Sequence, residues 1–188
     1  MEEQQQRIRE ENAIVLDFLP NGYPFDKSPA HRKTPIVQAI GVEHFTLLEL
    51  VPKKDIHINS HDKVYIGKGK RDHIHHINGR IPLSKLTQTA AGELPFVVKQ
   101  MLIDDEKRFV DFFNNARPLS MRMHQLELLP GLGKKHMWEV LEERKVKPFE
   151  SFADIKERVK LIPDVHKLFF NRIMKELEGL DKHKLFVE

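Results

Sequence analysis

Residues 129–135 have the composition of a phosphate-binding turn. They read Leu-Pro-Gly-Leu-Gly-Lys-Lys and lie between two segments whose apolar residues recur at helical spacing. Gly131 and Gly133 permit backbone conformations that residues with a Cβ avoid, so amide N–H groups can point outward toward a phosphate. Lys134 and Lys135 then begin the next helix, at the end where the peptide dipoles favour an anion. The alternative is a tight interhelical turn without a ligand.

Positive charge is concentrated in two parts of the chain, although the whole chain carries a formal net charge of only +3. Residues 53–85 contain eight basic and three acidic residues, and residues 117–147 contain seven and four. The intervening residues 86–116 are acidic. Such basic stretches favour a surface that binds a nucleic-acid backbone, and backbone contacts carry no sequence information. Arg122, in the second stretch, is expected to support the phosphate contact of the glycine-containing turn.

Within the first basic stretch, residues 63–71 combine cations, glycines and one aromatic ring. Tyr65 can stack on an unpaired base while the neighbouring cations hold phosphates. The alternative is a solvated strand edge whose charges prevent aggregation. The residues predicted to take part in binding are Lys63, Tyr65, Lys68, Lys70 and Arg71.

The segment Asp72–His76 is rich in histidine. In a strand, His73 and His75 would project from the same face, where His57 or His61 could approach them to form a metal site. The alternative is a set of partly exposed histidines that gain charge below about pH 6.5. We favour this second interpretation and predict neither a metal nor another cofactor.

The sequence contains no pattern that is typical of catalysis. It has no Walker loop, no nucleophile elbow and no His-Glu-x-x-His motif. The absence of cysteine excludes disulfides, thiolate metal sites and thiol catalysis. The carboxylates of Asp104–Glu106 are adjacent on a predicted helix, so they point in different directions. We therefore predict a protein without enzymatic activity.

The elements that position these residues begin with a small β-sheet domain. Short apolar and β-branched runs are separated by turn residues, and no long helical pattern intervenes. The predicted strands cover residues 13–19, 35–40, 44–51 and 62–67. Asn78-Gly79 is typical of a tight turn. This pattern predicts a small antiparallel barrel over residues 13–82, preceded by a flexible segment of residues 1–12.

After Pro82 the apolar residues recur with the period of helices, which predicts a helical domain over residues 83–188. We expect Ser120 to cap a helix that ends at Leu128, and a further helix over about residues 134–145.

Aromatic residues mark the expected core of this helical domain. Phe109, Phe112 and Phe113 share helical spacing and are predicted to be buried. Trp138 lies partly off the inner face of its helix, where it either packs against the rest of the protein or anchors a base or a partner. Ser151 is predicted to cap a later helix.

The segment from residue 129 to residue 169 resembles the double helix-hairpin-helix unit of DNA- and RNA-handling proteins. In such units one hairpin carries the two glycines, a Phe-x-Ser-x-x-Asp-Ile segment opens the third helix, and a second hairpin follows. Residues 149–155 match this middle segment. Residues 161–165 replace the second glycine hairpin, so the resemblance implies one intact hairpin at residues 129–135 and one degenerate hairpin.

Together with the N-terminal β region and the His-Gln-Leu-Glu-Leu run at residues 124–128, the whole chain resembles the archaeal domain-of-unknown-function family 655. This resemblance implies an OB- or SH3-like barrel followed by a helix-hairpin-helix domain, with a role in nucleic-acid binding. The association of the family with translation and ribosomal genes favours RNA over DNA.

We therefore predict an α+β protein with two domains that binds nucleic acid without catalysis and without sequence preference. A translation or transcription protein is a further predicted partner. The alternatives are an interaction adaptor that does not touch nucleic acid and a metal-dependent enzyme. The polar N-terminal sequence and the lack of a long apolar run predict a cytoplasmic protein with no secretory signal and no membrane span.

Overall fold

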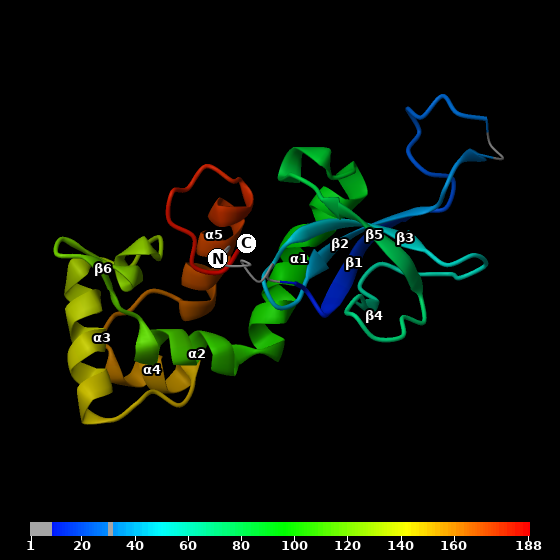
Figure 1. Cartoon of the computed structure of the whole chain (residues 1–188). Helices are drawn as coiled ribbons and strands as arrows, with labels where there is room; N and C mark the ends of the chain where they lie inside the picture. The colour runs from blue at the N-terminus through cyan, green and yellow to red at the C-terminus, as the bar shows by residue number, and fades with distance from the viewer. Residues whose placement is uncertain (1–8, 30–31) are drawn as a thin grey trace, which may run out of the picture. The chain divides into compact units, whose positions relative to one another are not determined.

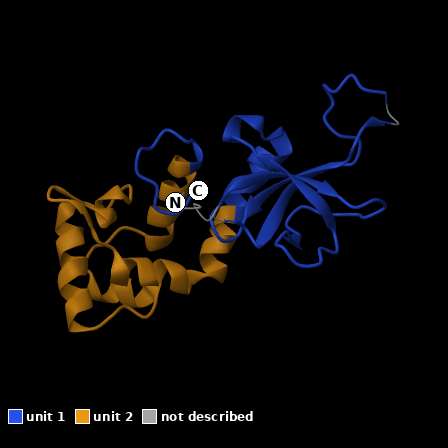
Figure 2. Ribbon diagram, in the orientation of Figure 1, with its two compact units in different colours: residues 1–97, 177–188 blue, residues 98–176 orange. Residues whose placement is uncertain are grey.

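The computed structural model describes residues 9–29 and 32–188. These residues form two compact units (Figure 2). The first unit comprises the described residues up to Val97 together with Leu177–Glu188, and the second comprises Val98–Glu176. The sequence predicts a boundary at residue 82, whereas helix α1 (Gln88–Asp104) begins in the first unit and ends in the second.

The first unit contains an antiparallel five-stranded sheet with the strand order β4-β1-β2-β3-β5 (Figure 1). Its strands are β1 (Asn12–Leu19), β2 (Ile36–Gly41), β3 (Leu47–Pro52), β4 (Lys63–Tyr65) and β5 (Ile74–Arg80). The α+β class and the N-terminal curled antiparallel sheet are thereby confirmed. Strands β4 and β5 stand at opposite edges of the sheet, which is a half-barrel.

The core of the first unit lies on the inward-facing residues of the strands. Val15, Val37 and Leu50 are fully buried, and nearly every residue of the central strands β2 and β3 is buried. The prediction of a tight turn at Asn78-Gly79 is wrong. Both residues lie within β5, where the pairing passes from Glu49–Gly79 to Leu50–Ile77 and leaves Asn78 as an extra residue. The conformational freedom of glycine is used here for a β-bulge.

Glu10 is a buried carboxylate that fixes the start of the described chain. It accepts hydrogen bonds from the backbone amides of Glu43 (2.8 Å), His44 (3.0 Å) and Thr46 (3.1 Å). A Cβ on Gly41 would collide with the Glu10 side chain, so glycine is required for this approach. Burial raises the pKa of Glu10 above its ordinary value. The predicted flexible segment extends to residue 12; residues 1–8 lie outside the described residues, and Glu10 is firmly held.

The helices of the second unit include the end of α1 and helices α2 to α5. Their bounds are α2 (Glu106–Asn115), α3 (Lys134–Val146), α4 (Phe152–Arg158) and α5 (Val165–Leu177), of which α5 ends in the first unit. The predicted helix of residues 134–145 is confirmed by α3. The predicted cap is confirmed at Ser151, whose hydroxyl accepts a hydrogen bond from the Asp154 amide at 3.0 Å.

The prediction of a helix from Ser120 to Leu128 is wrong. That segment forms a two-stranded hairpin, β6 (Pro118–Ser120) and β7 (Met123–His124), followed by the 3-10 helix η3 (Gln125–Leu128). His124 begins η3 because its Nδ1 accepts from the Leu126 amide at 3.1 Å. Its own amide donates to Glu127 at 2.9 Å, which completes a capping box. A histidine in the serine position of this box obscured the helix start in the sequence.

Phenylalanine rings form the core of the second unit. Phe109 and Phe113 are fully buried, as predicted, whereas Phe112 is only half-buried. The ring centroids of Phe109 and Phe113 lie 4.9 and 5.5 Å from that of Phe169. Phe152 stacks on Phe169 at 5.8 Å. Trp138 is 60% exposed on α3. Among the described residues, no helix combines the length and apolar character needed to cross a membrane.

Candidate nucleic-acid interface

The first hairpin joins η3 to α3 through a tight turn whose two glycines are exposed. Gly131 has a φ of +101°, which side-chain-bearing residues rarely adopt, and this conformation reverses the chain. The Leu132 amide donates to the Leu129 carbonyl at 3.0 Å, and both leucine side chains are buried. The predicted glycine hairpin therefore forms, and its apolar residues anchor it to the rest of the unit.

The N-terminus of α3 has no side-chain cap. Gly133 occupies the N-cap position in an extended conformation, and its carbonyl accepts the first helical hydrogen bond from Met137 at 3.0 Å. A Cβ on Gly133 would meet no atom within 4 Å. The first-turn amides of α3 therefore receive no hydrogen bond from a capping side chain, and the space beside Gly133 is open.

Exposed cations accompany this uncapped helix end. Lys134 and Lys135 are exposed, and the Lys135 ammonium lies 3.9 Å from Glu139, an ion pair too solvated to immobilise it. Arg122 lies in the exposed turn between β6 and β7. Anions bind readily where helix amides and lysine ammonium groups meet.

The second hairpin has the same turn, but a side chain caps the helix that follows it, α5. Leu161 adopts a φ of +57°, and the Ile162 amide donates to the Val159 carbonyl at 3.4 Å, as in the first hairpin. The carboxylate of Asp164 accepts from the Lys167 amide at 2.9 Å, so the protein supplies its own anion at the start of α5. The two hairpins therefore have the same type of turn. The helix after the first hairpin has no side-chain cap, whereas the helix after the second is capped by a carboxylate that would repel a phosphate.

Two arginines hold the far end of α3 in place. Arg158 of α4 donates to the carbonyls of Glu143 (2.6 Å) and Lys147 (2.7 Å), and its guanidinium lies 4.5 Å from the centre of the Phe149 ring. Arg144 donates from Nη1 to the Phe113 carbonyl at 3.0 Å. Because these bonds fix the helix, the position of its N-terminus is set by the fold rather than by the ligand.

In the first unit, the predicted aromatic residue packs on its own loop. The Tyr65 hydroxyl accepts a hydrogen bond from the Gly69 amide at 3.0 Å. A Cβ on Gly67 would collide with the Tyr65 ring, which explains the glycines that follow this tyrosine. Lys63, Lys68 and Lys70 are exposed around this loop.

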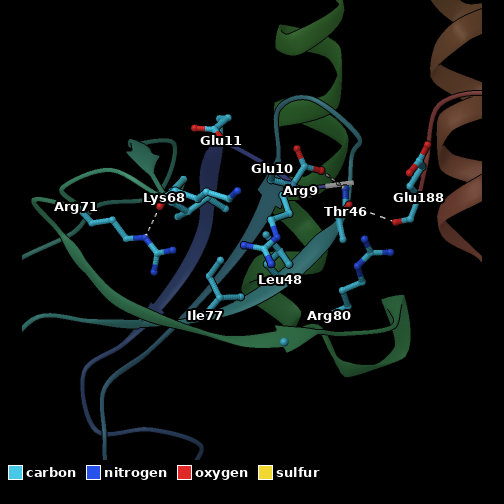
Figure 3. Close-up of a pocket in the computed structure, with 13 residues that line it drawn as sticks. Arg9, Glu10, Glu11, Thr46, Leu48, Lys68, Arg71, Ile77, Arg80 and Glu188 are labelled. Atoms are coloured by element: carbon cyan, nitrogen blue, oxygen red, sulfur yellow. Dashed lines mark hydrogen bonds between the residues drawn. The ribbon is translucent and has the colours of Figure 1, made fainter. Parts of the chain in front are cut away.

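A cavity of about 840 Å³ opens on the half-barrel near this loop (Figure 3). Two of the predicted residues, Lys68 and Arg71, line it, whereas Lys63, Tyr65 and Lys70 are not among its lining residues. The Arg71 side chain is oriented by a 2.9 Å hydrogen bond from its Nε to the Gly67 carbonyl. The structure therefore brings part of the predicted basic edge into a concave surface.

The histidine-rich strand does not assemble a metal centre in the described residues, which contain no group of three or more potential metal ligands. His73 precedes β5, and His75 lies within it. The Nδ1 atoms of His75 and His76 are 2.7 Å apart, and His76 Nε2 lies 3.0 Å from the Asn78 side-chain oxygen.

Comparison with known proteins places this architecture in one family. The family model described as "Protein of unknown function (DUF655)" matches residues 9–188. The chain belongs to the DUF655 family. It is 46% identical over 181 residues to the uncharacterized protein MJ0038 of Methanocaldococcus jannaschii, with 95% of this chain and 80% of that protein covered.

A solved DUF655 structure has the same fold. The crystal structure of Af1531 from Archaeoglobus fulgidus superposes with a TM-score of 0.86 at 49% identity, covering 95% of this chain and 100% of that one. The identity of this chain as a DUF655 member is therefore supported by sequence and by structure.

The cavity of this DUF655 protein includes residues that no sequence pattern predicts to take part in binding. Arg9 falls in the segment predicted to be flexible, and Arg80 lies beyond the predicted tight turn. Leu48 and Ile77 also line the cavity, and both lie in strands. Simple alternation would place Ile77 and Arg80 on opposite faces of β5, and the extra residue Asn78 in the bulge shifts this alternation, so that both line the cavity. No local pattern connects them to Arg9.

Proposed function

We propose that this DUF655 protein is a non-catalytic nucleic-acid-binding protein that holds the phosphate backbone without reading sequence. The observation that carries this proposal is the contrast between the two hairpins. The first leaves the α3 N-terminus uncapped at Gly133 beside two exposed lysines, whereas the second is capped by Asp164. A turn used only to connect helices would gain stability from a capping side chain, so an open helix end with cations favours an external anion.

The basic edge of the first unit supports the same function. Lys63, Lys68 and Lys70 are exposed, and Lys68 and Arg71 border a concave surface. RNA is favoured over DNA because proteins that recognise RNA target unpaired, splayed bases, which fit a small concavity better than a duplex does. The ligand we propose is RNA of the translation machinery or of ribosome-related metabolism.

The test is a binding titration with structured RNA, single-stranded RNA and duplex DNA at two salt concentrations. Binding should weaken steeply with salt, because phosphate contacts release counterions. The Lys134→Glu/Lys135→Glu variant should lose on the order of tenfold in affinity or more. Its matched control is Lys160→Glu/Lys167→Glu, which makes the same charge change at the second hairpin. Equal losses in both variants, or no binding by the parent at low salt, would refute the role of the first hairpin.

An adaptor function is favoured by a second observation. Met121 at the tip of the β6–β7 hairpin is fully exposed, and its neighbours Leu119 and Met123 are partly exposed. Exposed apolar side chains on a hairpin are typical of a protein contact. A partner protein retained at high salt by the parent, and lost from a Met121→Ser variant, would support this function.

A further inference from the structure

The cavity of the first unit is formed by the opening of the half-barrel. Ile66, Gly67 and Lys68 follow the edge strand β4, whereas Ile77 and Arg80 belong to β5 at the other edge. The half-barrel therefore holds between its two edges a volume that a closed barrel of this size would fill with side chains. In Figure 3, Leu48 and Ile77 lie between Lys68 and Arg71 on one side and Arg80 on the other.

The chemistry of the cavity combines an apolar surface with a basic rim. Leu48, Ile66 and Ile77 supply the apolar part. The cations are Arg9, Lys68, Arg71 and Arg80, and the carboxylates are Glu10, Glu11 and Glu188. The Glu10 carboxylate is turned toward three backbone amides, and the four cations outnumber the other two carboxylates, so the rim is predominantly basic. This combination fits a ligand with a flat apolar body and an attached anion.

We propose that this cavity binds one unpaired nucleotide, with the base on the apolar surface and the phosphate at the basic rim. The proposal deepens the proposed function by naming a site in the first unit and the chemistry that it takes. Its volume of about 840 Å³ lies within the range of small-molecule sites, whereas a paired base in a duplex has no access to a pocket of this kind.

Because the proposed site uses its cations for the phosphate, few of its other side chains can read base identity. The Thr46 hydroxyl, its one uncharged side-chain hydroxyl, donates to the Glu188 carbonyl at 3.2 Å. Aliphatic side chains contact every base in a similar manner because they make no directional bonds. We therefore expect differences of only a few-fold among the four bases.

The experiment is an NMR titration of the ¹⁵N-labelled full chain with three probes at equal nucleotide concentration. The probes are uridine monophosphate, a single-stranded uridine hexamer and an RNA duplex of six base pairs. The hexamer should shift the amides of Thr46, Gly67 and Gly79, which line the cavity, and the duplex should leave them in place. This titration uses the unmodified protein, so its result does not depend on whether a variant folds.

Charge-reversal variants then assign the affinity. Arg9→Glu/Arg80→Glu should weaken hexamer binding on the order of tenfold. The control is Lys27→Glu/Lys54→Glu, which changes the charge of the same unit equally at exposed lysines outside the cavity and should change binding by about threefold or less.

The outcomes separate this inference from the proposed function. Hexamer-induced shifts confined to residues 129–135 would overturn the cavity and leave the hairpin function standing. Shifts in the cavity that persist in Lys134→Glu/Lys135→Glu would support the cavity site independently of the hairpin. Tighter binding of uridine monophosphate than of the hexamer would support the nucleotide site and identify a free nucleotide as its ligand. The absence of any shift with all three probes would overturn both.

Discussion

Replacing Gly133 with aspartate should stabilise the protein and weaken its binding to nucleic acid. The N-cap backbone is extended, so a side chain is accommodated without strain, and no atom lies within 4 Å of the new Cβ. The carboxylate would accept first-turn amide hydrogen bonds, worth a few tenths of a kcal/mol relative to glycine. Its charge at the helix N-terminus adds about 0.3–1 kcal/mol. The expected gain is therefore about 0.5–1 kcal/mol.

The same carboxylate would occupy the proposed phosphate position. It would remove the amide contact and place two negative charges near each other, at a cost of about 1 kcal/mol for charges 4 Å apart in water and more at a protein surface. Because about 1.4 kcal/mol corresponds to a tenfold change, affinity should fall about tenfold or more. Stability and binding are thus predicted to move in opposite directions.

Urea denaturation and an RNA titration on the same preparation would measure both effects. The Gly133→Asn variant is the control, since it caps the helix without adding charge and should weaken binding less than aspartate does. A variant that is stabilised but binds RNA as tightly as the parent would refute the assignment of the α3 N-terminus as a phosphate site.

Three further predictions concern the elements that position this site. Gly131→Ala should destabilise the protein by about 1–3 kcal/mol because its φ of +101° is strained for alanine, whereas Leu161→Gly should stabilise it by about 1 kcal/mol by relieving a φ of +57°; thermal denaturation would measure both. Arg172→Leu should cost about 3–5 kcal/mol, because it removes the 2.6 Å ion pair between two buried side chains, Arg172 and Glu176. The double leucine variant should recover part of that loss in urea denaturation. Burial lowers the pKa of His124, so its contribution to stability should be complete above about pH 6.5 and be lost as the pH falls through its lower folded-state pKa; a stability–pH profile of His124→Gln that is flatter than that of the parent would confirm this.

The sequence predicted the features that depend on local conformation. Gly131 and Gly133 identified the first hairpin because glycine spacing has a direct backbone meaning. Ser151 identified the start of α4 for a similar reason. The segment after Ser120 was mispredicted because the cap residue is His124, whose ability to accept through Nδ1 depends on its tautomer and burial.

The cavity could not be predicted because it depends on contacts between distant parts of the chain. Arg9 is placed by the bonds of Glu10 to the loop near residue 44, a separation of more than thirty residues. Arg80 is placed by a bulge whose Asn-Gly sequence resembles a turn. Neither arrangement has a local signature, so the basic residues appeared in the sequence as a linear stretch rather than as the rim of a pocket.

The single uncapped hairpin has a consequence for how a nucleic acid would be held. A unit with two uncapped hairpins would bind two phosphates and fix the direction of the strand. In this chain the carboxylate of Asp164 occupies the second anion position. A strand bound at one phosphate can rotate about that contact, and it dissociates when this single contact breaks. Contacts at the α3 N-terminus should therefore exchange rapidly, and any preferred strand polarity would have to originate elsewhere in the protein.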